Sequence, residues 1–174
     1  NSATAMHANG AQAANSIATE SGMVTITATG SGSGFAHGMN ARDSGSNSIA
    51  TTGSDNVKIS ANAAANSGYG VFANASGSNT VETVGGKIDV SGSGAAGYGM
   101  HATTADTSND ISTQSGGISV SGNAANGNGY GMSATISGSN AVKTESGDVE
   151  VRGHSTSGNA HGVSAVSSGS NAIT

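Results

Sequence analysis

Residues 129–151, GYGMSATISGSNAVKTESGDVEV, contain one complete copy of a pattern that recurs along the whole chain. The clearest marker of the pattern is an asparagine followed two residues later by isoleucine or valine. Six asparagines occupy this position at intervals of 30–32 residues: Asn15, Asn47, Asn79, Asn109, Asn140 and Asn171. A repeat of this length is typical of a protein in which each unit stacks on the next and the core extends along a line.

Three short segments recur inside each unit. In the quoted copy they are Gly131–Ala134, Asn140–Thr144 and Val149–Val151. The third segment alternates β-branched and polar residues, and this period of two predicts a strand with one buried face. Glycine, serine, asparagine and aspartate fill the gaps and favour turns. Each unit of about 31 residues is therefore predicted to contain three strands of three to five residues and three turns. The turn after the third segment varies most in length, and it is the natural place for functional loops.

Stacking of equivalent strands predicts rows of inward-facing side chains. The first row is Met6, Met39, Val71, Met100, Met132 and Val163, with Ala8, Ala41, Ala73, Ala102, Ala134 and Ala165 beside it. The second row is Ile17, Ile49, Val81, Ile111, Val142 and Ile173. The third is a double row: Val24, Ile26, Val57, Ile59, Ile88, Val90, Ile118, Val120, Val149 and Val151. We expect the repeated asparagines to point inward at a corner, where stacked amides can hydrogen-bond to one another.

These features predict an all-β parallel β-solenoid of about five and a half coils. The chain has no leucine, and its 29 glycines among 174 residues disfavour helical repeats. It has no proline, which disfavours collagen. A disordered glycine- and serine-rich chain would not keep its isoleucine and valine residues in register over six units.

Composition narrows the range of functions. The formal net charge is −5, and the five lysine and arginine residues are scattered, so we expect no binding to nucleic acid and no insertion into a membrane by this segment. The chain has no cysteine, and no pair of histidines has zinc-ligand spacing. Adjacent units show no paired carboxylates of the kind that glycosidases use. We therefore expect no metal, no cofactor and no catalytic residue.

The outward positions hold the candidate contact residues. All three tyrosines precede the glycine of the first segment, and His37 and His161 fill the same slot in other units. This row of flat rings has two interpretations, which are simple stacking or a strip that contacts carbohydrate or protein. A polar row on the third segment offers a second surface. The complete candidate set is Phe72, His101, Tyr69, Tyr98, Tyr130, Ser60, Asp89, Ser91 and Ser121.

The repeat reads Tyr-Gly-Met-x-Ala, then Ser-Gly-Ser-Asn-x-Ile-x-Thr, then Ile-x-Val-Ser-Gly. It resembles the passenger repeats of bacterial autotransporters, the type V secreted proteins of the Gram-negative surface. The resemblance covers essentially the whole chain and implies a right-handed parallel β-helix that is exported through the outer membrane and displayed outside the cell. Residues 1–174 would then be a single solenoid segment of a longer passenger domain.

Autotransporter passengers include adhesins that act in cell aggregation, biofilm formation and virulence, and some passengers carry protease or lipase domains. We see no inserted catalytic domain in these 174 residues. The leading hypothesis is a non-enzymatic adhesin segment whose partners are copies of itself on neighbouring cells, or a protein or glycan of the host surface. Two alternatives stay open: an inert stalk that presents a distal domain, and a carbohydrate-processing β-helix enzyme.

Overall fold

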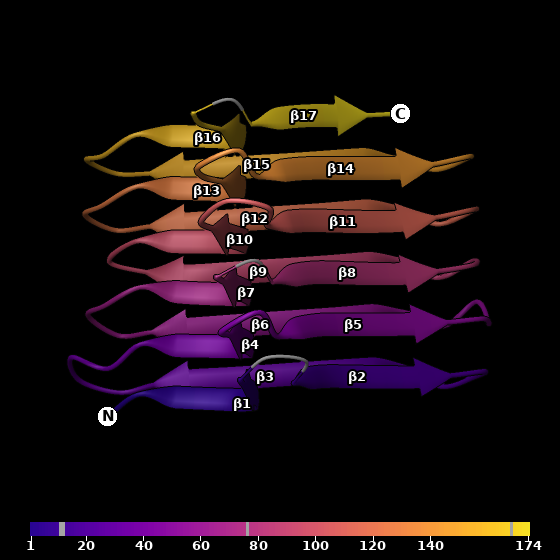
Figure 1. Cartoon of the computed structure of the whole chain (residues 1–174), viewed down its shortest axis with the longest axis horizontal. Helices are drawn as coiled ribbons and strands as arrows, with labels where there is room; N and C mark the ends of the chain where they lie inside the picture. Colours follow the sequence, from indigo (N-terminus) through magenta and orange to yellow (C-terminus); the bar gives the residue numbers. More distant parts are fainter. Residues whose placement is uncertain (11–12, 76, 168) are drawn as a thin grey trace.

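The computed structural model describes residues 1–10, 13–75, 77–167 and 169–174. In these ranges the chain forms strands and turns without a helix, and each strand pairs in parallel with its equivalent one repeat away (Figure 1). The strands form three sheets, which we call sheets A, B and C in the order in which each coil visits them. Sheets A and B contain six strands each and sheet C contains five. The predicted β-solenoid is therefore confirmed.

The bounds of the strands are as follows. Sheet A consists of β1 (Ala3–Asn9), β4 (Ala36–Arg42), β7 (Gly68–Asn74), β10 (Gly97–Thr103), β13 (Gly129–Ala134) and β16 (Ala160–Ala165). Sheet B consists of β2 (Ala14–Thr19), β5 (Ser46–Thr51), β8 (Ser78–Thr83), β11 (Ser108–Thr113), β14 (Ser139–Thr144) and β17 (Ser170–Ile173). Sheet C consists of β3 (Val24–Gly30), β6 (Val57–Ala63), β9 (Ile88–Gly94), β12 (Ile118–Ala124) and β15 (Val149–Ser155).

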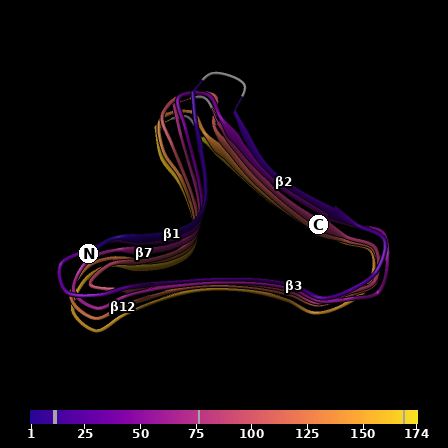
Figure 2. The ribbon, with the colours of Figure 1, turned by 90° about the horizontal axis from the view of Figure 1, so that it is seen from below.

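The handedness of the coil is visible in Figure 2, which looks along the stack from the N-terminal end. The chain runs from β1 through β2 to β3 in a clockwise sense while it moves away from the viewer, so the coil is right-handed. Sheet B and sheet C are nearly straight in this view. Sheet A has a sharp bend in its middle, and its outer surface is concave at the bend.

The predicted inward rows form the core. Register pairing places equivalent residues directly above one another, as in Met100 with Met132 and Val90 with Val120. Met39, Ile49, Val81 and many other members of these rows have an exposed fraction of 0%. The members in the first and last coils are less covered, because a strand at the end of the stack has a neighbour on one side only. Each buried side chain of this size stabilises the fold by about 1.5–3 kcal/mol.

The repeated asparagines form the predicted ladder. The side-chain Nδ2 of Asn79 donates to Oδ1 of Asn109 at 2.7 Å, and Nδ2 of Asn109 donates to Oδ1 of Asn140 at 2.8 Å. Each amide also donates to a backbone carbonyl of sheet A, for example from Asn109 to Ser133 at 2.9 Å. Asn79 and Asn109 are fully buried, so these bonds satisfy donors that water cannot reach.

Two details differ from the expectation or refine it. Most strands are six or seven residues long, longer than the three to five expected, because small residues extend the pairing beyond the apolar core positions. β15, for example, pairs with β12 over seven positions and includes Gly153–Ser155. The corner between sheets C and A varies between two and five residues, which confirms that it absorbs most of the length variation.

The bend of sheet A depends on its glycines. In a flat strand, residues three apart face opposite sides, yet Tyr69 and Phe72 of β7 both lie on the outer side with ring centroids 5.0 Å apart. The backbone must therefore turn between them, at Gly70 and Val71. A Cβ at the equivalent Gly99 would lie 2.5 Å from Cγ1 of Val120 and 2.6 Å from the carbonyl oxygen of Gly131. Glycine is needed because the bent backbone packs directly on the side chains of sheet C.

We expect Gly99→Ala to lower the free energy of unfolding by about 1–3 kcal/mol, the usual cost of overpacking a core. The matched control is Gly117→Ala, where the nearest atom to the added Cβ is 3.5 Å away and the φ angle is not positive. Urea unfolding of both variants measures the difference. Equal stability of the two variants would contradict the tight packing of the bend.

Candidate functional site on the outer face of sheet A

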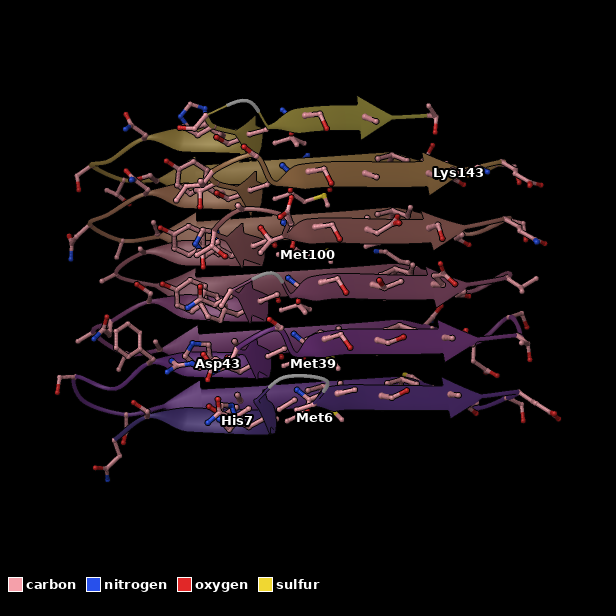
Figure 3. The ribbon with its side chains drawn as sticks, viewed as in Figure 1. Met6, His7, Met39, Asp43, Met100 and Lys143 are labelled. Carbon is pink, nitrogen blue, oxygen red and sulfur yellow. The ribbon has the colours of Figure 1, made fainter. Side chains whose placement is uncertain are left out.

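The bend of sheet A brings together two outward rows that the sequence keeps apart. The first row precedes the glycine of each coil and contains Tyr69, Tyr98 and Tyr130. The second row follows it by two residues and contains Phe72 and His101. We call the combined set of rings the aromatic strip: Phe35, His37, Tyr69, Phe72, Tyr98, His101, Tyr130 and His161. Figure 3 shows side-chain rings stacked above one another from coil to coil, and the labelled Met39 and Met100 are fully buried in the core.

Stacking is continuous along the first row. The ring centroids of Tyr69 and Tyr98 are 4.8 Å apart with an interplanar angle of 12°, and those of Tyr98 and Tyr130 are 5.4 Å apart. His37 and His161 extend the stack at the two ends, at 5.0 Å and 5.3 Å. The spacing follows from strand pairing, because equivalent residues of neighbouring coils are separated by the distance between strands. Contacts of this kind contribute about 0.5–1.5 kcal/mol per pair.

The second row packs against the first across the bend. The centroid of His101 lies 4.5 Å from that of Tyr98, and the centroid of Phe72 lies 5.5 Å from that of His37. His101 is only 9% exposed, and burial lowers its pKa from 6.5 to about 4. Burial also raises the pKa of Tyr98 to about 12, together with the neighbouring phenols of Tyr69 and Tyr130. The rings of His101 and Tyr98 are therefore uncharged at neutral pH.

Two adjoining hollows lie at the N-terminal part of the strip. The smaller, of about 170 Å³, is lined by Phe35, His37, Arg42, Tyr69 and Phe72. The larger, of about 340 Å³, shares three of these residues and is lined by Ser2, Thr4, His7, Phe35, His37, Asn40 and Arg42. The strands that carry the smaller hollow, β4 and β7, both have paired neighbours on either side.

Arg42 gives the lining of the hollows a positive charge although the whole chain is negative, and Asp43, the next residue, lines neither hollow. Arg42 is the sole lysine or arginine in the strands of sheet A, and these strands contain no aspartate or glutamate. In the described ranges, ion pairing is confined to Arg152 and Glu150 on sheet C, so Arg42 has no acidic partner. Burial lowers the pKa of His37 to about 4, and the nearby charges of Arg42 and His7 lower it further.

The structure divides the nine predicted contact residues between two surfaces. Phe72, His101 and the three tyrosines lie together on the concave side of sheet A. The remaining four lie on the outer face of sheet C, which faces another direction (Figure 2): Ser60, Asp89, Ser91 and Ser121. Their side chains are half-buried, and the serine row is in register from one coil to the next. His101 was expected at an open outward position, but the bend covers it with neighbouring rings.

Seven lining residues of the hollows were not in the predicted contact set, although His37 belongs to the predicted row of flat rings: Ser2, Thr4, His7, Phe35, His37, Asn40 and Arg42. Phe35 lies in the longest corner between sheets C and A, where the sequence predicts functional loops. The length of that corner is therefore a feature of the sequence that could have identified Phe35 as a contact residue. Asn40 shares its row with Phe72 and Ser133, and Arg42 pairs with Asn9, so the repeat pattern does not single out either residue and their role is evident only in three dimensions.

No group of three or more histidine, cysteine, aspartate or glutamate side chains in the described part of the chain is arranged to hold a metal ion. Among the same residues, no helix has the length and hydropathy to cross a membrane.

Comparison with known proteins gives no match: no protein-family model fits the chain, and neither a curated protein nor a solved structure is significantly similar to it.

The buried imidazole of His101 predicts a pH-dependent stability. The pKa of His101 in the folded state lies below its unfolded value of 6.5. The neutral ring therefore contributes fully to the free energy of unfolding above pH 6.5, and this contribution is lost as the pH falls towards about 4. Between pH 7 and pH 4, protonation of His101 should lower the free energy of unfolding of the wild type by on the order of 3 kcal/mol. The variant His101→Phe carries the residue of the paired Phe72 and should not show this part of the loss. Urea unfolding at both pH values measures this, and an unchanged pH dependence in the variant would refute it.

Proposed function

We propose that the chain is a segment of a non-enzymatic adhesin displayed on the bacterial cell surface. It attaches through the outside of the coil to copies of itself or to a host surface. Two features support this proposal: the repeat pattern resembles that of autotransporter passengers, and the right-handed solenoid is the architecture that this resemblance implies.

The aromatic strip is the observation that carries the proposal. The core is already filled by the three inward rows, so the rings are not needed to close it. The two outer rows accept small residues in other coils, where Thr4 pairs with His37 and Ser133 pairs with His101. Tyr69, Tyr98 and Tyr130 are half-buried, and each exposes part of a ring to solvent. Partly exposed aromatic rings with polar tips are enriched at protein contact surfaces.

A stalk is the second candidate, because the outer face of sheet B carries mainly small or polar residues. Its outward row reads Ser16, Ser48, Thr80, Asp110 and Ala141. A face of this kind holds no anchor for a tight contact. It suits a rod that holds another domain away from the cell.

Attachment of coated beads tests the adhesin proposal. Beads that carry the chain should attach to one another or to cultured epithelial cells several-fold more than beads that carry the double variant Tyr69→Thr and Tyr98→Thr. Threonine is the residue that the same row contains at Thr4, so the fold should be retained. The control variant, Ser16→Thr and Ser48→Thr, places on sheet B the residue that the same row contains at Thr80 and should attach like the wild type.

If the chain is a stalk, neither the wild type nor the tyrosine variant should attach. Attachment that is equal for the wild type and the tyrosine variant would contradict the role of the aromatic strip. Release of reducing ends from bacterial or host polysaccharides would favour the carbohydrate-processing alternative.

A further inference from the structure

The two hollows beside Arg42 have the composition of a binding site. Phe35, Tyr69 and Phe72 supply apolar ring surface, and Phe35 is 40% exposed. The larger hollow, of about 340 Å³, falls in the size range of small-molecule sites in proteins. Because the two hollows share Phe35, His37 and Arg42, they form one continuous concave region over β4 and its neighbours.

Two residues that line this region hold buried polar atoms without a hydrogen-bond partner. Oδ1 of Asn40 and Nδ1 of His37 are buried and have no hydrogen-bond partner among the described residues, and their side chains are only 3% and 6% exposed. A buried polar atom without a partner costs about 1–3 kcal/mol. The fold does not need the amide at Asn40, because the same row holds phenylalanine at Phe72 and serine at Ser133. Both atoms are shielded from solvent, so a ligand can bond to them only after the side chain turns towards the hollow.

The charge of the region favours an anion. Arg42 has no acidic partner in the described ranges, and the strands of sheet A carry no carboxylate. A guanidinium binds a planar carboxylate with two parallel hydrogen bonds, which is stronger and more directional than a contact between neutral groups.

We propose that this region, formed by Phe35, His37, Asn40, Arg42 and Phe72, binds a saccharide unit that bears a carboxylate. The proposal rests on the adhesin function and names the class of its ligand. The carboxylate of the sugar pairs with Arg42. The apolar face of the sugar ring lies against the aromatic side chains, whose negative faces attract its C–H groups.

Hydroxyl groups favour a saccharide over an acidic peptide. A hydroxyl both donates and accepts, so it can satisfy the acceptor Oδ1 of Asn40 and either protonation form of Nδ1 of His37. An acidic peptide carries its donors in backbone N–H groups away from the carboxylate, whereas a sugar carries hydroxyl donors on the same ring as its carboxylate. The lining of the region therefore matches a ligand with a carboxylate and several hydroxyls.

Saturation-transfer NMR and titration with defined oligosaccharides test the proposal on the full chain. The acidic probes are sialyllactose and a hyaluronan tetrasaccharide. Their neutral counterparts are lactose and the carboxyl-reduced tetrasaccharide. We expect at least one acidic probe to bind, with its neutral counterpart at least about tenfold weaker, because a charge-assisted hydrogen bond is worth about 1.5–3 kcal/mol.

Two arginine variants locate the site. Arg42→Asn introduces the residue of the paired Asn9, and Arg152→Ser introduces the residue of the paired Ser121, so both keep the register of their sheets. Arg42→Asn should weaken binding of the acidic probe at least about tenfold, whereas Arg152→Ser should leave it unchanged. Circular dichroism and the melting temperature establish that both variants are folded.

Three results would overturn the proposal: no binding of either acidic probe, equal effects of the two arginine variants, or equal binding of an acidic tetrapeptide. The bead assay shows whether only the saccharide proposal is wrong or the adhesin function is wrong as well. Beads that still attach through the aromatic strip, without binding the acidic probes, would refute the ligand class alone. Loss of both would refute the adhesin function as well.

Discussion

The buried asparagine ladder is the interaction on which the register of the whole coil depends. From Asn15 to Asn140, each amide bonds to the amide of the next coil and to a backbone carbonyl of sheet A, as Asn79 does with Asn109 and with His101. A slip of one residue would place an apolar or outward side chain at this corner and leave buried donors unpaired. Apolar rows favour stacking of coils, but isoleucine and valine are interchangeable along them, so they specify register less strictly than the amides do.

A fixed register on the inside leaves the outside free to vary. Because equivalent outer residues are stacked at the distance between strands, any ring that recurs in the repeat becomes a continuous stack. The bend of sheet A then folds this stack against a second row and creates a concave surface from Tyr98, His101 and their equivalents. The regular interior therefore produces an extended outer feature without an inserted domain, and a change in one coil, such as Arg42, gives that feature a local chemistry.

The fold could be predicted well from the sequence, because the repeat identifies the residues that occupy the same position in successive coils. The inward rows, the asparagine ladder and the variable corner all followed from the spacing of Asn15 and its equivalents. The bend of sheet A could not be predicted from alternation, because Gly70 and its equivalents break the period of two without any apolar marker. For this reason the tyrosine row and the row of Phe72 and His101 were placed apart, and Asn40 and Arg42 were not recognised as neighbours of the rings.

The most direct test of this account is the stability of Asn109→Asp compared with that of Asn62→Asp, an exposed position on sheet C. The ionised carboxylate cannot donate to Oδ1 of Asn140 or to the carbonyl of Ser133, whereas the protonated carboxyl can donate one hydrogen bond, so its folded pKa should lie above its unfolded value of about 3.9. The free energy of unfolding, relative to the wild type, should then fall as the pH rises from 4 to 7, by about 3–4 kcal/mol, which is the limit for one proton over three pH units. The account predicts this loss for Asn109→Asp and a change below about 0.5 kcal/mol for Asn62→Asp. Equal stability of the two variants at pH 7 would contradict it.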